Sequence, residues 1–286
     1  MLSAAIEEAR EAVEARILTS LGGIALPVAR AMGYAVQGGK GLRGFLVLEG
    51  ARINNAANNA ALSVAAGIEC IHAYSLVHDD LPCMDDDDLR RGQPTVHRKW
   101  DEATAVLAGD ALQSLGFELV LQNDAPAEAR LTLAHSLARA AGIRGLVGGQ
   151  AMDIAAESAA DPLSLTEVEV LQAGKTGALI EWASMAGAWI SGANPAPLGR
   201  YGKALGLAFQ IWDDVLDVEG DAVRMGKAVR KDADAGKATF VSLLGLDEAK
   251  RRANELVTEA CDTIVIYGEE ADRLRALANY VVTRDR

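Results

Sequence analysis

Cysteine is scarce in this chain, and its three copies lie far apart. Cys70, Cys83 and Cys261 form no CxxC pair, so the sequence predicts neither a zinc knuckle nor a disulfide framework. Isolated cysteines are typical of reduced thiols in a cytosolic protein. The N-terminal segment carries acidic residues and has no apolar core of the kind that a signal peptide needs. These absences predict a cytoplasmic protein.

Long apolar runs are absent too. No stretch of 18 consecutive apolar residues occurs, so no membrane-spanning helix is expected. The net charge of −12 gives the chain nothing to gain from counterion release on DNA, and nucleic acid is not an expected partner. Aromatic residues make up only 5% of the sequence and there are only seven prolines, while alanine and leucine are abundant. That composition favours helices.

Apolar residues recur at helical spacing along most of the chain. We expect helices over 6–18, 41–53, 60–81, 103–122, 125–141, 143–157, 165–191, 197–218, 237–243, 247–266 and 269–283. Thr166 begins "TEVE", which resembles a helix start. Neither an alternating strand pattern nor an Asn-Gly or Asp-Gly hairpin signal is found. No linker divides the chain, so the sequence predicts an all-α helical bundle forming a single domain over residues 1–286.

The first acidic cluster lies in "HDDLPCMDDDDLRRG", where positions 79–88 hold six aspartates. Asp79 and Asp80 end a long apolar helix that Pro82 should terminate or kink, and Asp85 follows after a four-residue gap. A run of aspartates by itself is typical of a solvated loop. Carboxylates this close repel one another and their pKa values rise, unless a cation lies among them.

The second acidic cluster is "FQIWDDVLD", which closes another apolar helix. Asp213, Asp214 and Asp217 lie on one face near the helix C-terminus, where the macrodipole disfavours anions. Hard oxygen ligands suit Mg²⁺, which prefers one or two carboxylates together with phosphate oxygens. The acids lack the spacing of an EF-hand loop, which disfavours Ca²⁺. Two incomplete clusters therefore predict a polyphosphate held with magnesium between them.

Basic residues could bind the same phosphates. Lys40 and Arg43 lie at a glycine-rich loop that enters a helix, without the spacing of a Walker A motif. Arg90 and Arg91 follow the aspartate run and could act as counter-ions or as phosphate clamps. Further candidates are His72, Lys175, Thr176, Lys227 and Lys237.

Six segments together resemble the bacterial short-chain trans-isoprenyl diphosphate synthases, most closely the farnesyl diphosphate synthases. They are the stretch 69–97 with its DDxxxxD pattern, "LAGDAL", "GGQAMDI", "KTGALI", "FQIWDDVLD" and "DADAGKATF", in the family's order. The resemblance implies the isoprenoid synthase fold, which is an all-α bundle around a deep central cavity, and a homodimer. It implies head-to-tail condensation of isopentenyl diphosphate with dimethylallyl or geranyl diphosphate, giving farnesyl diphosphate.

The resemblance also implies roles for individual residues. Three Mg²⁺ ions would bridge the allylic diphosphate to Asp79, Asp85 and Asp213, with Asp80, Asp214 and Asp217 as further ligands or supporting contacts. Lys175, Lys227 and Lys237 would stabilise the departing pyrophosphate. Isopentenyl diphosphate would be held by Lys40, Arg43, His72 and Arg91, and the allylic substrate by Arg90, Thr176 and Gln210.

Two segments depart from the family pattern. The family reads GGKRxRP where this chain has GGKGLRG, so Gly41 replaces an arginine and Gly44 a proline. We expect a looser loop and weaker binding of isopentenyl diphosphate. Phe240 and Val241 stand where the family often has Tyr-Pro, a change expected to be structural.

Chain length can be argued from helix geometry. Tyr74 and Ser75 precede Asp79 by five and four residues, which is about 6–7.5 Å along a helix. A bulky Tyr74 should form a floor under the growing chain, and family members with an aromatic residue here stop at C15. The alternatives are a C20 or C10 synthase, a non-catalytic prenyltransferase subunit, and a terpene cyclase. Two intact aspartate motifs disfavour the subunit, and a second diphosphate site disfavours the cyclase.

Overall fold

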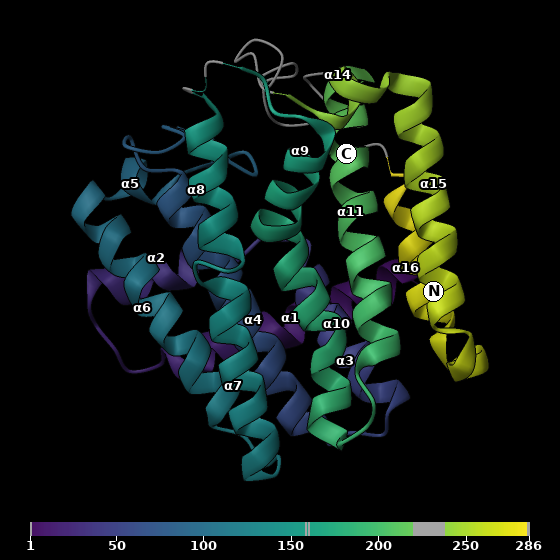
Figure 1. The fold of residues 1–286 in the computed structure, drawn as a ribbon. Helices are drawn as coiled ribbons and strands as arrows, with labels where there is room; N and C mark the ends of the chain where they lie inside the picture. The colour runs from purple at the N-terminus through teal and green to yellow at the C-terminus, as the bar shows by residue number, and fades with distance from the viewer. Residues whose placement is uncertain (1, 158, 160, 220–237, 285–286) are drawn as a thin grey trace. The chain divides into compact units, whose positions relative to one another are not determined.

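The computed structural model describes residues 2–157, 159, 161–219 and 238–284, and these residues are almost entirely helical (Figure 1). The all-α prediction is confirmed. The chain forms two compact units. The first contains Met1–Ala134 and Ala186–Ala193, and the second contains His135–Met185 and Asn194–Arg286. The single domain over 1–286 stays a prediction.

The first unit is built around the long helix α4, which packs against α6 and α3. Its elements are α1 (Leu2–Ser20), α2 (Pro27–Ala35), α3 (Leu42–Ile53), α4 (Asn58–Asp79), β1 (Leu89–Arg90), β2 (Gln93–Pro94), α5 (Val96–Lys99), α6 (Glu102–Leu121), most of α7 (Ala127–Ala141) and the end of α10 (Ala178–Ser191). Because α4 is apolar on nearly all sides, it is buried along most of its length. It ends at Asp79, three residues before Pro82, as the sequence predicts.

Two helices of the described part of the chain, α4 and α6, are long and apolar enough to cross a membrane. The apolar window of α4 is 78% buried inside the protein and that of α6 is 44% buried. A core helix of a folded protein passes the same test of length and hydropathy, so this finding is weak support for a membrane span.

The second unit is centred on α11, which runs beside α15 (Figure 1). Its elements are the end of α7, α8 (Leu146–Glu157), α9 (Leu165–Gln172), the π-helix η1 (Ala173–Gly177), the start of α10, α11 (Ala196–Glu219), α14 (Phe240–Leu244), α15 (Leu246–Thr263), the 3₁₀ helix η2 (Val265–Ala271) and α16 (Asp272–Val281). The buried hydroxyl of Tyr201 on α11 donates to the Leu274 carbonyl of α16 at 2.7 Å. This bond fixes α16 to α11.

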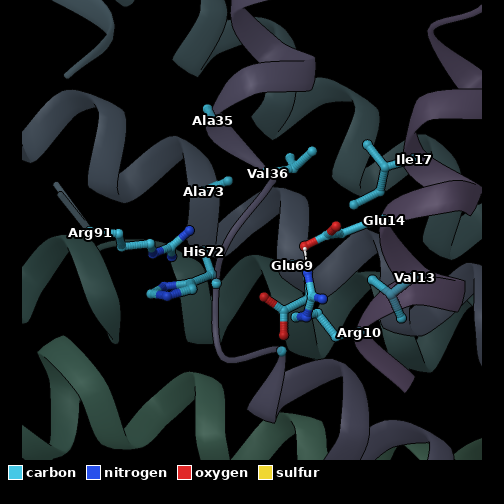
Figure 2. Close-up of a pocket in the computed structure, with 12 residues that line it drawn as sticks. Arg10, Val13, Glu14, Ile17, Ala35, Val36, Glu69, His72, Ala73 and Arg91 are labelled. Atoms are coloured by element: carbon cyan, nitrogen blue, oxygen red, sulfur yellow. Dashed lines mark hydrogen bonds and ion pairs between the residues drawn. The ribbon is translucent and has the colours of Figure 1, made fainter. Parts of the chain in front are cut away.

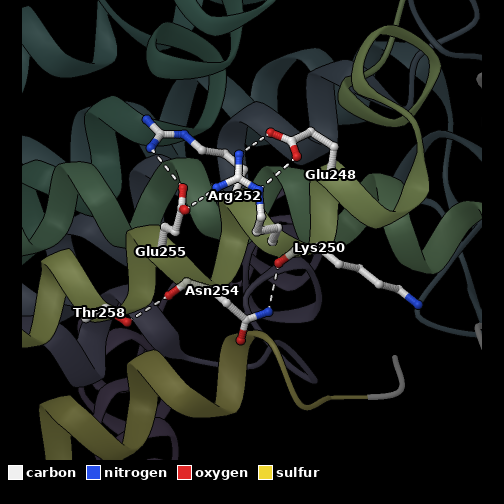
Figure 3. A network of polar contacts seen from close by, with 7 residues as sticks. Glu248, Lys250, Arg252, Asn254, Glu255 and Thr258 are labelled. Atoms are coloured by element: carbon white, nitrogen blue, oxygen red, sulfur yellow. Dashed lines mark hydrogen bonds and ion pairs between the residues drawn. The ribbon is translucent and has the colours of Figure 1, made fainter.

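The outer face of α15 carries a network of charged side chains (Figure 3). Arg251 pairs with Glu248 and Glu255 on its own helix, and Lys250 Nζ lies 2.7 Å from Glu219 at the end of α11. Such exposed pairs contribute about 0–1 kcal/mol each. The opposite face, with the buried residues Ala249, Ala253, Leu256, Val257 and Ala260, therefore holds α15 in place.

The structure differs from the sequence predictions in local features. A short antiparallel hairpin, β1–β2, lies where only a loop was expected, because each strand has two residues and gives no alternating pattern. The cap of α9 is Ser164 rather than Thr166, and it forms a capping box with Glu167.

Candidate active site

The first acidic cluster is a loop that folds back on the end of α4. The backbone N–H of Asp85 donates to the carbonyl of Asp79 at 2.8 Å, and the N–H of Met84 donates to Leu81 at 2.8 Å. The four-residue gap between Asp80 and Asp85 is therefore a closed turn. It brings the backbones of Asp79 and Asp85 together, although six positions separate them in sequence.

Asp80 is the C-cap of α4, and its carboxylate pairs with Arg90. Its Oδ1 accepts from Arg90 Nε at 2.7 Å and lies 2.5 Å from Nη2. The side chain of Asp80 is only 4% exposed, whereas that of Arg90 is 31% exposed. Burial raises the pKa of the Asp80 carboxyl, and the hydrogen bond from Arg90 opposes that increase.

The β1–β2 hairpin directs Arg90 and Arg91 to different partners. Arg91 and Gly92 form its two-residue turn with φ of 53° and 74°, as a type I′ turn requires. Arg90 binds Asp80, while Arg91 Nη1 donates to the carbonyl of Gln37 at 3.0 Å. One guanidinium therefore faces the acidic loop, and the other anchors the glycine-rich segment before α3.

Cationic side chains gather beside this segment, in a pocket drawn in Figure 2. Figure 2 shows His72 and Arg91 together on one side, with Arg10, Glu14 and Glu69 on the other. Burial lowers the pKa of His72 well below its usual value, and the charges of Arg43, Arg91 and Arg90 lower it further. A neutral imidazole among three guanidinium groups is suited to binding an anion.

Arg43, whose charge acts on His72, adds a further donor to this group of cations. Its Nε is buried, and no described residue accepts a hydrogen bond from it. Burial lowers the pKa of Arg43, and the charge of Arg91 lowers it further. The carboxylate of Glu69 raises the pKa and so opposes both effects. A buried guanidinium N–H without an acceptor is costly unless a ligand supplies one.

A neighbouring cavity of about 420 Å³ is lined by one acidic and two cationic side chains of the first unit. Asp80, Arg90 and Arg91 line it together with Gln37 and the apolar residues of α4. Carboxylate and guanidinium groups thus share one cavity wall, an arrangement that can hold a phosphate and a divalent cation together.

In the second unit, Asp213 on α11 is bound by Arg284. Arg284 Nη2 donates to Asp213 Oδ1 at 2.8 Å, and the two side chains are 2% and 37% exposed, respectively. The Arg284 guanidinium also donates to the Phe209 carbonyl at 3.3 Å and stacks on the Phe209 ring at 4.0 Å. Gln210 Nε2 lies 3.5 Å from the other oxygen, Asp213 Oδ2. One oxygen of Asp213 is held by the buried arginine, and the side chain still reaches solvent.

The other acids of this cluster have structural contacts. Asp214 Oδ2 accepts from the backbone N–H of Phe240 at 2.7 Å, at the start of α14. Phe240 itself is 1% exposed, in keeping with the structural role expected for this departure. Asp217 is buried on α11. Asp213 is 37% exposed whereas Asp217 is buried, so of these two Asp213 has the carboxylate that a metal ion can reach.

Lys175 lies on the π-helix η1 and pairs with Asp153 of α8. The distance from Lys175 Nζ to Asp153 Oδ2 is 2.6 Å. Gly149 allows α8 and η1 to approach each other this closely, since a Cβ at that position would lie 2.1 Å from the backbone nitrogen of Lys175. Thr176 follows on the same π-helical turn, and such turns are frequent at functional sites.

A model of the polyprenyl synthetase family matches residues 27–272. The chain is 42% identical to a farnesyl diphosphate synthase from Escherichia coli, covering 100% of this chain and 98% of the relative. It is 43% identical to a farnesyl diphosphate synthase from Haemophilus influenzae, covering 90% and 89%. A solved FPP/GFPP synthase from Zymomonas mobilis superposes with a TM-score of 0.90 at 43% identity over 98% of both chains. The chain belongs to the polyprenyl synthetase family.

Most of the predicted site residues of this polyprenyl synthetase lie within the two units. The first unit brings Asp80, Arg90 and Arg91 to one cavity, His72 and Arg91 to another, and the backbones of Asp79 and Asp85 to each other. Lys40 and Arg43 belong to the same unit. The second unit carries Asp213, Asp214, Asp217 and Gln210 on α11, and Lys175 and Thr176 on η1. Lys227 and Lys237 lie outside the described residues.

Sequence reasoning missed the residues that hold these groups. Asp153 was visible in "GGQAMDI" but had no partner until the fold placed Lys175 beside it. Arg284 and Glu69 gave no signal, because each is a single charge far in sequence from the group that it binds.

The donor set can be tested for Mg²⁺ from its chemistry. Among the described residues, no group of three or more His, Cys, Asp and Glu is placed to hold a metal ion. Mg²⁺ prefers one or two carboxylates with phosphate oxygens and waters over a cage of protein ligands. Asp79 with Asp85, and Asp213 alone, supply such partial sets of hard oxygen ligands, so the residues fit magnesium bound together with a diphosphate.

Proposed function

We propose that this polyprenyl synthetase is a prenyltransferase that condenses isopentenyl diphosphate with dimethylallyl or geranyl diphosphate to give farnesyl diphosphate. Farnesyl diphosphate synthases from several bacteria share 40–43% of its residues over most of its length, which supports this reaction. The observation that carries the proposal is the cavity wall of the first unit, where Asp80 lies beside Arg90 and Arg91.

Different residues contribute to the ionisation of the allylic diphosphate. Arg90 binds the allylic diphosphate, and Lys175, with Lys227 and Lys237, stabilises the negative charge on the leaving pyrophosphate. Asp79, Asp85 and Asp213 would hold Mg²⁺, three ions by the family pattern. When bound, these ions neutralise the charge that develops on the leaving oxygens. Thr176 and Gln210 line the allylic site.

Condensation follows within walls that exclude water. Lys40, Arg43, His72 and Arg91 hold isopentenyl diphosphate, and Arg43 Nε gains the acceptor that it otherwise lacks. The C–O bond of the allylic substrate breaks, and the allylic cation is attacked by the double bond of isopentenyl diphosphate. The released pyrophosphate then takes the proton that is lost. Water in this space would quench the cation, so the apolar walls protect it.

The chain-length proposal rests on α4. Tyr74 is 5% exposed and Ser75 is 6% exposed, one helical turn before Asp79. Ser75 Oγ is engaged with the His72 carbonyl at 2.9 Å. Tyr74 presents a large ring whose edge meets His78, with ring centroids 5.9 Å apart. The ring of Tyr74 is the group that we propose stops the chain at C15.

The protein is further proposed to be a cytoplasmic homodimer in which no helix crosses a membrane. Several apolar residues on α6 and α7 are exposed, namely Val106, Leu107, Leu121 and Leu131. We propose that these side chains of α6 and α7 lie at the interface with a second copy. Light scattering of the purified protein without detergent tests both points, with twice the chain mass expected.

Turnover is the direct test of function. Incubation with dimethylallyl and isopentenyl diphosphates should give C15 product in the presence of Mg²⁺ and none in its absence. Farnesyl diphosphate alone should release no hydrocarbon. The proposal is overturned if the two substrates give no product, or if farnesyl diphosphate alone is cyclised.

A further inference from the structure

The N-terminal helix α1 reaches the glycine-rich segment before α3 with two side chains. Glu14 Oε1 accepts from the backbone N–H of Gly38 at 3.2 Å and from Arg10 Nη1 at 2.9 Å. The Cβ of Arg10 lies 3.0 Å from the position that a Cβ of Gly41 would take. The pair thus touches both ends of the segment Gly38–Gly41.

This segment cannot fix its own conformation. It contains three glycines in four residues, and Gly38 and Gly41 have φ of 73° and 63°. Glycine has the largest backbone entropy to lose on ordering, so contacts from elsewhere must hold the segment. It carries Lys40 and leads into Arg43, both of which are proposed to bind isopentenyl diphosphate.

Arg10 and Glu14 are placed to supply such contacts. Their side chains are 22% and 18% exposed, and both line the pocket that His72 and Arg91 also line (Figure 2). Arg91 holds the preceding residue, Gln37, through its carbonyl. At the far end, the N–H of Gly44 donates to Glu69 Oε1 at 2.8 Å, a bond that the proline of the family pattern could not make.

We propose that Arg10 and Glu14 are a positioning pair that holds Gly38–Gly41 so that Lys40 and Arg43 can bind a diphosphate. The inference rests on the proposed function for the identity of that diphosphate. Neither residue touches the reacting atoms. Among the described residues, the hydrogen bond that the pair makes outside its own helix goes to the segment that carries Lys40 and leads into Arg43. Loss of the pair should therefore weaken the binding of isopentenyl diphosphate and leave the binding of the allylic substrate unchanged.

The test compares KM values for the two substrates. Glu14→Ala should raise KM for isopentenyl diphosphate about tenfold, because a charge-assisted bond to a backbone N–H is lost. KM for geranyl diphosphate and kcat should stay within about twofold. Glu14→Gln keeps an oxygen for Gly38 but loses its charge, so a rise of about threefold is expected. Glu11→Ala, at an exposed position of the same helix, is the matched control and should match the wild type.

Hydrogen exchange provides a readout that does not depend on turnover. The amides of Gly38–Gly41 should exchange faster in Glu14→Ala than in Glu11→Ala, with the rest of α3 and α4 unchanged. The charge-neutral double variant Arg10→Met/Glu14→Gln should be less impaired than the sum of its single variants. Equal rises in both KM values, or unchanged exchange in the loop, would overturn the inference. If the wild type fails to make product but the loop still loosens in Glu14→Ala, the proposed function fails and the positioning role stands.

Discussion

Each acidic cluster contains an ion pair between an aspartate and an arginine that differ in burial, Asp80–Arg90 in the first and Asp213–Arg284 in the second, and the buried partner is not the same in the two pairs. In the first cluster the carboxylate of Asp80 is 4% exposed and its partner Arg90 is 31% exposed. In the second, Asp213 is 37% exposed and its partner Arg284 is 2% exposed. The same ion pair thus presents its positive member to solvent in one unit and its negative member in the other.

Because of this inversion, the two ion pairs have different functions. A buried charge is tied to its partner, since leaving it unpaired costs several kcal/mol. The exposed partner keeps that contact and can bind a ligand with the polar atoms that face solvent. Arg90 is therefore the group of the first pair that can bind a phosphate, and Asp213 is the group of the second that can bind a metal ion. Asp80 and Arg284 hold them in position.

Among the predictions, we expect Asp213→Asn, which breaks the second ion pair, to have the largest effect on activity. The exposed carboxylate is lost as a metal ligand, so kcat/KM should fall on the order of 10³-fold in saturating Mg²⁺. Glu219→Gln is the matched control on the same helix, because Glu219 is exposed and pairs with Lys250. Retention of a tenth or more of wild-type turnover by Asp213→Asn would contradict the assignment of the ligand to Asp213.

The variants Arg90→Met and Arg284→Met show how much each ion pair contributes to the free energy of unfolding. Arg90→Met leaves Asp80 buried without its partner and should lower the free energy of unfolding by about 3 kcal/mol. Arg284→Met leaves an aspartate that water can reach and replaces a buried charge by an apolar side chain, so about 1 kcal/mol is expected. Urea denaturation in metal-free buffer measures both. Equal losses, or the reverse order, would show that burial does not decide which partner is structural.

The sequence predicts much of this comparison but not its inversion. Both clusters, the helices that carry them and Arg90 follow from pattern, because charged runs beside apolar helices are local features. Arg284 does not, since it meets Asp213 across 71 positions and only the packing of α16 against α11 brings them together. The closure of the first loop was likewise hidden, because it depends on a backbone bond from Asp85 to Asp79.

The first cluster has a bulky aromatic residue five positions before its first aspartate, and substituting it should alter product length. Tyr74→Ala removes the proposed floor and should raise the ratio of C20 to C15 products about tenfold, because an apolar pocket already discriminates a single added methylene by about 1–3 kcal/mol. Phe209→Ala is the matched control, because Phe209 lies four residues before Asp213 and stacks on Arg284. It should leave product length unchanged. Chromatography of dephosphorylated products gives the answer, and C15 alone from Tyr74→Ala would place the floor elsewhere.

The first cluster, unlike the second, has a histidine, His72, near several arginines. This arrangement predicts that the stability of the protein depends on pH. Burial and the charges of Arg43, Arg91 and Arg90 lower the pKa of His72 well below 6.5 in the folded state. The unfolded chain therefore binds more protons as the pH falls below 6.5, so the stability that His72 contributes is present above that pH and is lost below it. The loss approaches about 1.4 kcal/mol per pH unit. Urea denaturation of the wild type and His72→Gln between pH 5 and pH 8 measures the difference. The two curves should run parallel above pH 7.5 and converge below pH 6.5, and curves that stay parallel throughout would mean that His72 is not shielded from protons by its arginines.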